Sequence, residues 1–193
     1  MEKYTTLYDV LIIGAGPSGS NAAISYKNLN PNLKVGLIDK SIFPRDKSCG
    51  DAIGPGVISA LKRFNNQHIL DNEPQVVSTT LYGPENIGIQ NYIPEVKNKE
   101  DSIVYVIPRI DLDNRILNLA KDLDVDVFEG YSFVSFEKDS DNKLVVEIKN
   151  GDNITKLGTK ILVGADGANS RVRKQLNVNT NSDWHKAIAI RAY

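Results

Sequence analysis

The chain has 193 residues, and a composition of 41% hydrophobic and 24% charged residues is that of an ordinary globular protein. Its formal net charge is −1, so no basic field favours nucleic acid as a partner. A single cysteine excludes an internal disulfide and a cysteine-rich zinc site, and no metal site is expected.

The first predicted elements form a βαβ unit around a glycine-rich loop. Residues 9–13 (DVLII) are a continuous apolar run, typical of a strand buried on both faces. They lead into the loop GAGPSG (14–19), and residues 20–29 then show a helical pattern that Pro31 ends. Residues 35–39 (VGLID) predict a second buried strand, which completes the unit.

The middle of the chain changes its pattern. Residues 40–56 predict a long loop, and residues 56–64 predict a short helix. Between residues 75 and 107, three strand-like pieces separated by polar turns predict an excursion into an antiparallel sheet. A helix with one apolar face is expected over residues 112–123.

The last third of the chain returns to the first sheet. Residues 125–128 predict a strand, and residues 132–157 alternate as three short strands. Residues 160–164 predict another buried strand, and residues 168–176 predict a helix. The final residues, 186–193, alternate like a strand, so we expect further strands to follow the end of the chain.

The glycine-rich loop has the spacing of a dinucleotide-binding motif. Gly14 would permit a tight turn, Gly16 would let the backbone approach a pyrophosphate, and Gly19 would let the helix pack closely on the strand. Unpaired N–H groups at the helix start would bind the phosphates. Asp39 ends the second strand and could accept hydrogen bonds from an adenosine ribose, which favours NAD or FAD over NADP. A glycine-rich turn without a ligand is the alternative.

Two other motifs have an open interpretation. Asp166 follows a predicted parallel strand, where the ligand crevice of an α/β sheet lies, but Asp166 or Ser170 could equally cap the next helix. Arg109 opens a helix, where its charge opposes the helix dipole. A phosphate or flavin contact would offset that cost, and a surface salt bridge with Asp111 or Asp113 is the alternative.

Together these motifs resemble a known family. The order of GAGPSG, Asp39-Lys40, FPRDKSCGD (43–51), PRIDLDNRIL (108–117) and GADGANSRVR (164–173) is similar to that in the FAD-dependent flavoproteins of the aromatic-hydroxylase superfamily. The Lys-Ser-Cys-Gly-Asp loop looks most like that of the geranylgeranyl reductase branch. The resemblance covers essentially the whole chain.

The resemblance implies the fold and the domains. The class is α/β, with a Rossmann-like FAD-binding domain that has a parallel sheet and a three-stranded antiparallel meander, and with part of an antiparallel substrate-domain sheet. Residues 1–74 and 108–180 would form the FAD-binding domain. Residues 75–107 and 181–193 would belong to the substrate domain. The family has a later Gly-Asp motif over the flavin, and this chain ends before it, which would weaken cofactor retention.

The resemblance also implies which residues bind FAD. The glycine-rich loop would hold the pyrophosphate, Asp39 the ribose with Lys40 beside it, and a backbone group near Phe133 the adenine. The implied cofactor-binding residues are Gly14, Ala15, Gly16, Pro17, Ser18, Gly19, Asp39, Lys40, Cys49, Gly50, Arg109, Asp166 and Gly167.

Cys49, the single cysteine, is the catalytic candidate. In this fold the loop that carries Cys49 and Gly50 would pass by the flavin ring. Arg45 and Lys47 would favour the thiolate, unless they are only solvated loop charges. After hydride transfer from reduced flavin to an isoprenoid double bond, Cys49 could donate the proton that the second carbon needs, or could only pack against the ring.

Three functions follow as hypotheses. The first is an FAD-dependent oxidoreductase that reduces geranylgeranyl double bonds of a lipid or pigment precursor, with NAD(P)H or another electron donor. The second is a flavin-dependent monooxygenase, and the third is a non-catalytic nucleotide-binding fragment. We expect a cytoplasmic protein without signal peptide or membrane span, with a lipid substrate suggesting peripheral membrane contact. The sequence does not predict an oligomeric state.

Overall fold

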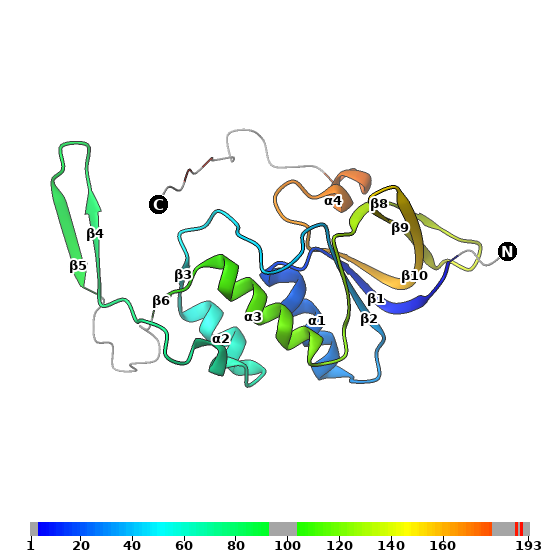
Figure 1. Cartoon of the computed structure of the whole chain (residues 1–193), viewed down its shortest axis with the longest axis horizontal. Coiled ribbons are helices and arrows are strands. Elements are labelled where there is room, and N and C mark those ends of the chain that lie inside the picture. Colours follow the sequence, from blue (N-terminus) through cyan, green and yellow to red (C-terminus); the bar gives the residue numbers. More distant parts are fainter. Residues whose placement is uncertain (1–3, 93–103, 179–187, 189, 191–193) are drawn as a thin grey trace. The chain divides into compact units, whose positions relative to one another are not determined.

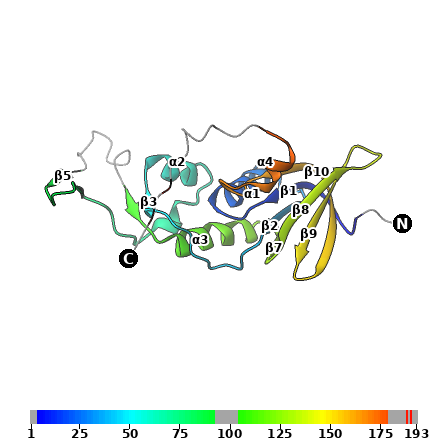
Figure 2. The same ribbon diagram turned by 90° about the horizontal axis from the view of Figure 1, so that it is seen from above.

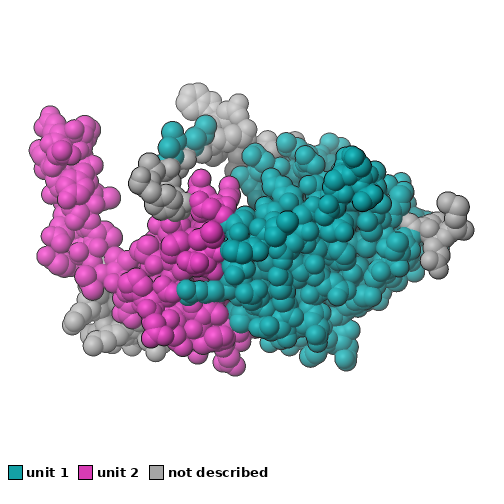
Figure 3. Space-filling model, viewed as in Figure 1, with its two compact units in different colours: residues 1–45, 113–190 teal, residues 46–112, 191–193 magenta. Residues whose placement is uncertain are grey.

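The computed structural model describes residues 4–92, 104–178, 188 and 190. It divides into two compact units, shown in separate colours in Figure 3. Unit 1 consists of residues 1–45 and 113–190, and unit 2 of residues 46–112 and 191–193. The expected division into FAD-binding and substrate domains follows ligand function, and it stays a prediction.

Unit 1 is built on one six-stranded sheet (Figure 1), whose strand order is β7-β2-β1-β10-β9-β8. The strands are β1 (Leu7–Ile13), β2 (Val35–Asp39), β7 (Asp126–Glu129), β8 (Ser132–Lys138), β9 (Leu144–Asn150) and β10 (Asn153–Gly164). β7, β2, β1 and β10 run parallel to one another, whereas β9 pairs antiparallel with both β10 and β8. The predicted α/β class, parallel sheet and antiparallel meander are confirmed.

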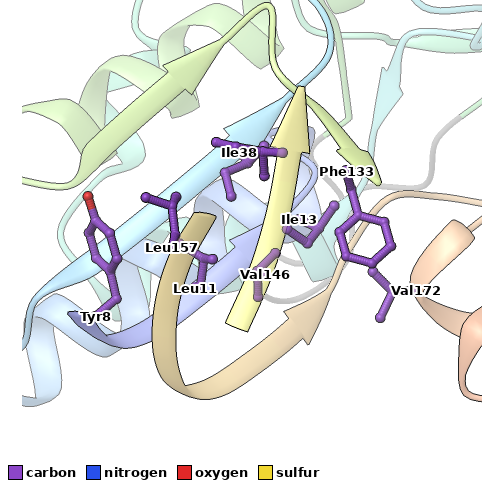
Figure 4. Packing of buried hydrophobic residues seen from close by; sticks show 9 residues of the cluster. Tyr8, Leu11, Ile13, Ile38, Phe133, Val146, Leu157 and Val172 are labelled. Atoms are coloured by element: carbon purple, nitrogen blue, oxygen red, sulfur yellow. The ribbon is translucent and has the colours of Figure 1, made fainter. Parts of the chain in front are cut away.

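The central strand is buried on both faces, as its sequence predicts. Residues 10–13 of β1 are at most 3% exposed. Figure 4 shows side chains of β1, β2, β8, β9, β10 and α4 packed in one cluster on a face of the sheet. Its labelled members are Tyr8, Leu11, Ile13, Ile38, Phe133, Val146, Leu157 and Val172. Burying each such side chain contributes about 1.5–3 kcal/mol, so this cluster fixes the sheet that carries the loops above it.

β10 differs from the prediction. The sequence predicts a third meander strand ending at residue 157 and a separate strand over 160–164, but the structure has one strand of 12 residues. Its first half pairs antiparallel with β9, and its second half pairs parallel with β1. Gly158 and Thr159 pair with both neighbours, so the chain continues extended through them without a turn. Figure 2 shows β8, β9 and β10 from above.

The described part of unit 1 contains two complete helices, α1 and α4. α1 (Pro17–Leu29) begins three residues before the predicted start, with Pro17 at its first position, where the missing N–H and the fixed φ of proline suit a helix start. α4 (Arg171–Gln175) is shorter than the predicted helix over 168–176.

Unit 2 holds smaller elements. They are β3 (Ala52–Ile53), α2 (Pro55–Arg63), a 3-10 helix η1 (Gln67–Leu70), β4 (Ser78–Tyr82), β5 (Gly88–Tyr92) and β6 (Tyr105–Val106). β4 and β5 form an antiparallel hairpin, as predicted, and β6 pairs with β3. β3 lies in the segment predicted as loop. α3 (Arg109–Lys121) begins in unit 2 and continues into unit 1. The strand predicted over 186–193 lies outside the described residues, except Ile188 and Ile190, which are in no strand.

Candidate functional site

The glycine-rich loop and the end of β10 pack directly on each other. Gly14 has a φ of +103°, and a Cβ at this position would lie 2.4 Å from the carbonyl oxygen of Ala165. A Cβ on Gly19 would lie 1.7 Å from the carbonyl oxygen of Gly14. The Ala165 N–H also donates a hydrogen bond of 2.7 Å to the Ile13 carbonyl. Two motifs that are far apart in sequence therefore form one surface, and glycine is needed at both crowded positions.

Gly16 has a different environment. It is the N-cap residue of α1, and no side chain accepts a hydrogen bond at this cap. A Cβ built on Gly16 would lie 3.4 Å from Nη2 of the Arg45 guanidinium. Ser18, in the first turn, is exposed. The start of α1 thus has backbone N–H groups, a positive dipole end and an open approach, which is the arrangement that binds phosphate.

Asp39 lies beside this loop at the end of β2. Its Oδ2 atom accepts a hydrogen bond of 2.8 Å from the Ala15 N–H, and its Oδ1 atom accepts one of 2.8 Å from the Ser41 N–H. These two bonds hold both the carboxylate and the loop in place. Because each carboxylate oxygen can accept a second hydrogen bond, Asp39 can still receive the hydroxyl groups of a ribose. Lys40, the next residue, is exposed.

Asp166 is engaged as a helix cap. Its Oδ2 atom accepts hydrogen bonds from the backbone N–H groups of Arg171 (2.6 Å) and Val172 (3.3 Å) at the start of α4, and its Oδ1 atom accepts one from the Ser170 hydroxyl. Ser170 in turn accepts one from the Arg173 N–H. Of the two interpretations of Asp166, the capping contacts are present in the structure, and the cofactor role stays a prediction. Gly167 follows with a φ of +82° and open space around it.

The predicted adenine contact lies on the edge strand β8. The carbonyl of Phe133 accepts a hydrogen bond of 3.2 Å from Nη1 of Arg171. The adenine contact stays a prediction.

Three predicted site residues belong to unit 2. Arg109 is the first residue of α3, and Cys49 is a partly buried free thiol in the segment before β3. Gly50 is exposed, and a Cβ at its position would meet nothing within 4 Å. The roles of these residues toward the flavin stay predictions.

Sequence reasoning left Arg45 out of the cofactor-binding candidates and did not predict its ion pair. Rather than being a solvated charge, its side chain is 18% exposed and forms an ion pair of 2.9 Å with Asp113, which is completely buried on α3. A signal for this pair exists in the sequence. Asp113 shares a helical face with Ile116, Leu117 and Ala120, all buried, and a carboxylate on a buried face requires a partner.

The chain belongs to a family of FAD-binding proteins. It matches the FAD binding domain family over residues 7–189. FAD is accordingly the cofactor, and the described residues fit it: an uncapped glycine-rich helix start for the pyrophosphate and an anchored carboxylate, that of Asp39, for the ribose.

The chain is similar to several curated proteins. It is 30% identical over 189 residues to a menaquinone reductase of Mycolicibacterium smegmatis, covering 97% of this chain and 44% of that protein. It is also 30% identical over 172 residues to the geranylgeranyl diphosphate reductase of Rhodobacter capsulatus, covering 88% of this chain and 40% of that protein. The chain therefore spans less than half the length of these relatives.

Solved structures share the fold. A p-nitrophenol 4-monooxygenase from Pseudomonas putida superposes with a TM-score of 0.78 at 17% identity, covering 90% of this chain and 44% of that one. A geranylgeranyl bacteriochlorophyll reductase-like protein from Thermoplasma acidophilum superposes with a TM-score of 0.68 at 24% identity, covering 84% and 40%. At these identities the likeness concerns the fold alone.

Within residues 4–92 and 104–178, no group of three or more His, Cys, Asp or Glu side chains is arranged to hold a metal ion. In the same part of the chain, no helix combines the length and the apolar character that crossing a membrane takes.

Proposed function

We propose that the chain is the FAD-binding part of an oxidoreductase that reduces double bonds of a prenyl chain in a lipid or pigment precursor. The observation that carries this proposal is the match to reductases over 88–97% of the chain, a span that includes the glycine-rich loop, Asp39 and the Cys49 loop together. Menaquinone and geranylgeranyl diphosphate both carry polyprenyl chains, so an isoprenoid is the substrate class that these relatives have in common.

The roles of the residues follow from their chemistry. Bound FAD, once reduced by NAD(P)H or another donor, supplies the hydride that one carbon of the double bond receives. The other carbon requires a proton, and Cys49 is the residue proposed to donate it or to position its donor. Gly14 to Gly19 and Asp39 bind and orient the dinucleotide, and Arg109, Asp166 and Gly167 are proposed as further cofactor contacts.

A monooxygenase is the second candidate. A ubiquinone biosynthesis monooxygenase of Dictyostelium discoideum is 29% identical over 198 residues, covering 89% of this chain and 39% of that protein. Such an enzyme would use oxygen to hydroxylate a small substrate and would not need a thiol at position 49. Cys49 therefore favours the reductase.

The test uses the protein with FAD, a chemical reductant and a geranylgeranyl substrate. A reductase adds two hydrogen atoms per double bond, which mass spectrometry detects, and it does so without oxygen. Cys49→Ser should lower the rate while FAD absorption after desalting stays unchanged. Oxygen consumption coupled to NAD(P)H, with a hydroxylated product, would support the monooxygenase instead. A chain that binds FAD but performs neither reaction would support the non-catalytic alternative.

A further inference from the structure

Arg45 lies beside the glycine-rich loop, where an ion pair and a ring contact hold its guanidinium. Its guanidinium forms the 2.9 Å ion pair with Asp113 and lies 4.8 Å from the centre of the Phe43 ring. Its Nη2 atom lies 3.4 Å from the position that a Cβ on Gly16 would take. All four residues belong to unit 1, so the arrangement lies within one compact body.

The guanidinium retains capacity to donate hydrogen bonds. Nη1 is buried, and its approach to Asp113 is an ion pair without hydrogen-bond alignment, so this atom has no hydrogen-bond acceptor in the structure. Leaving a buried charged donor unsatisfied costs free energy. Nη2 lies on the other side of the guanidinium, next to Gly16, so an anion at the start of α1 would accept hydrogen bonds from Nη2 and not from the buried Nη1.

Asp113 explains why the arginine stays in place. A fully buried carboxylate is costly to desolvate, and a buried ion pair seldom stabilises a fold beyond what an apolar pair would. Its effect here is geometric: an otherwise flexible side chain is fixed against the loop before a ligand arrives. Fixing it in advance lowers the entropy lost on binding.

We propose that Arg45 binds the diphosphate of FAD, and that Asp113 is its positioning residue. The inference rests on FAD being the cofactor, and it assigns the diphosphate a side-chain cation in addition to the backbone N–H groups of α1. An arginine suits this task because its planar guanidinium can donate two parallel hydrogen bonds to phosphate oxygens.

The experiment measures binding of FAD, ADP and adenosine to the purified chain by titration calorimetry. FAD and ADP carry the diphosphate, and adenosine does not. In Arg45→Gln, the dissociation constants for FAD and ADP should rise about ten- to hundredfold, because a hydrogen-bonded charge is lost, whereas that for adenosine should not change. Arg45→Lys should recover part of the affinity.

The control is Lys138→Gln, which removes the same charge from an exposed position at the end of β8. It should leave all three dissociation constants unchanged. Asp113→Asn keeps the arginine but frees it, so FAD and ADP should bind more weakly than to wild type. The double variant Arg45→Gln with Asp113→Asn removes both charges of the buried pair and keeps the test valid if Arg45→Gln alone fails to fold.

Two results would overturn the inference. If Arg45→Gln weakens the binding of adenosine as much as the binding of ADP, Arg45 supports the fold and does not bind the diphosphate. If Arg45→Gln binds FAD and ADP as tightly as wild type, Arg45 has no role in binding. A wild-type chain that binds neither FAD nor ADP would contradict the inference that the diphosphate site forms within this chain.

Discussion

At the scale of single residues, Gly14 shows how one missing side chain permits the site. Gly14→Ala would place a methyl group 2.4 Å from the Ala165 carbonyl oxygen at a φ of +103°. We expect backbone strain to lower the free energy of unfolding by about 1–3 kcal/mol, and the clash to lower it further. FAD binding should be lost as well. Urea unfolding and flavin absorption after desalting measure the two effects.

The matched control is Gly151→Ala. Gly151 also has a positive φ, +55°, but a Cβ there meets nothing within 4 Å. Gly151→Ala should lower the free energy of unfolding by only about 1 kcal/mol, the usual penalty of a left-handed conformation, and should leave FAD binding unaffected. Equal losses in the two variants would show that the contact with Ala165 contributes nothing.

Tyr8 makes the stability of the fold sensitive to alkaline pH. Burial, and then the hydrogen bond and charge of Asp126, raise the pKa of the Tyr8 phenol above its ordinary value of 10.0. The Tyr8 hydroxyl donates a 3.0 Å hydrogen bond to Oδ2 of Asp126. Above pH 10 the unfolded chain releases this proton while the folded chain keeps it, so the free energy of unfolding falls as pH rises.

Tyr8→Phe tests this linkage. At neutral pH the free energy of unfolding of the variant should be about 1 kcal/mol lower than that of wild type, because the hydrogen bond to Asp126 is lost. Above pH 10 the free energy of unfolding should fall less steeply with pH in the variant than in wild type. The two slopes should differ by up to about 1.4 kcal/mol per pH unit. Urea unfolding from pH 7 to 11 gives both slopes, and parallel curves would contradict the raised pKa.

At the scale of elements, α4 covers part of an exposed strand edge. The Gln175 side chain donates a hydrogen bond of 2.6 Å from Nε2 to the Phe136 carbonyl, and its Oε1 atom accepts one of 3.1 Å from the Phe136 N–H. The amide thus replaces a neighbouring strand at one position of β8, which is the last strand of the sheet. An uncovered edge can pair with another chain.

Gln175→Ala should uncover this edge. We expect a loss of about 1 kcal/mol in the free energy of unfolding and faster aggregation. Urea unfolding measures the first effect and light scattering the second. Lys174→Ala, at the exposed neighbouring position of α4, is the control and should change neither quantity. If both variants aggregate at the wild-type rate, the amide does not protect the edge.

The elements also show which parts of the fold local sequence determines. β1, β2 and the helix between them were predicted because an apolar run, a glycine loop and a second apolar run lie within 33 residues of chain, from Leu7 to Asp39. The continuity of β10 was not predicted, because its extended path through Gly158 depends on pairing with β1 and β9. Similarly, the ion pair of Arg45 joins residues from separate elements, and no motif spacing relates them.

At the scale of the whole molecule, the β4–β5 hairpin leaves apolar side chains in solvent. Leu81 and Ile89 face each other across the hairpin and are 68% and 66% exposed. Ile87, 66% exposed, continues the same face by strand alternation. A two-stranded hairpin is at best marginally stable alone, so this surface is expected to bind apolar probes.

The double variant Leu81→Thr with Ile89→Thr tests this expectation. It should reduce the fluorescence of a bound apolar dye, and the free energy of unfolding should change by less than about 0.5 kcal/mol because both residues are exposed. Leu29→Thr replaces an isolated leucine that is 82% exposed and serves as the control. Undiminished dye binding in the double variant would show that the dye binds to another part of the protein and not to the hairpin.

The contact between Gly14 and Ala165 has a consequence for biosynthesis. β1 lies between β2 and β10 in the sheet, and β10 follows the other five strands of this sheet in the chain. At about 5–20 residues per second, about 8 to 30 seconds separate the synthesis of Gly14 from that of Ala165. During that interval Ala165 is absent from the surface, so the nascent chain offers FAD only the glycine-rich loop and Asp39.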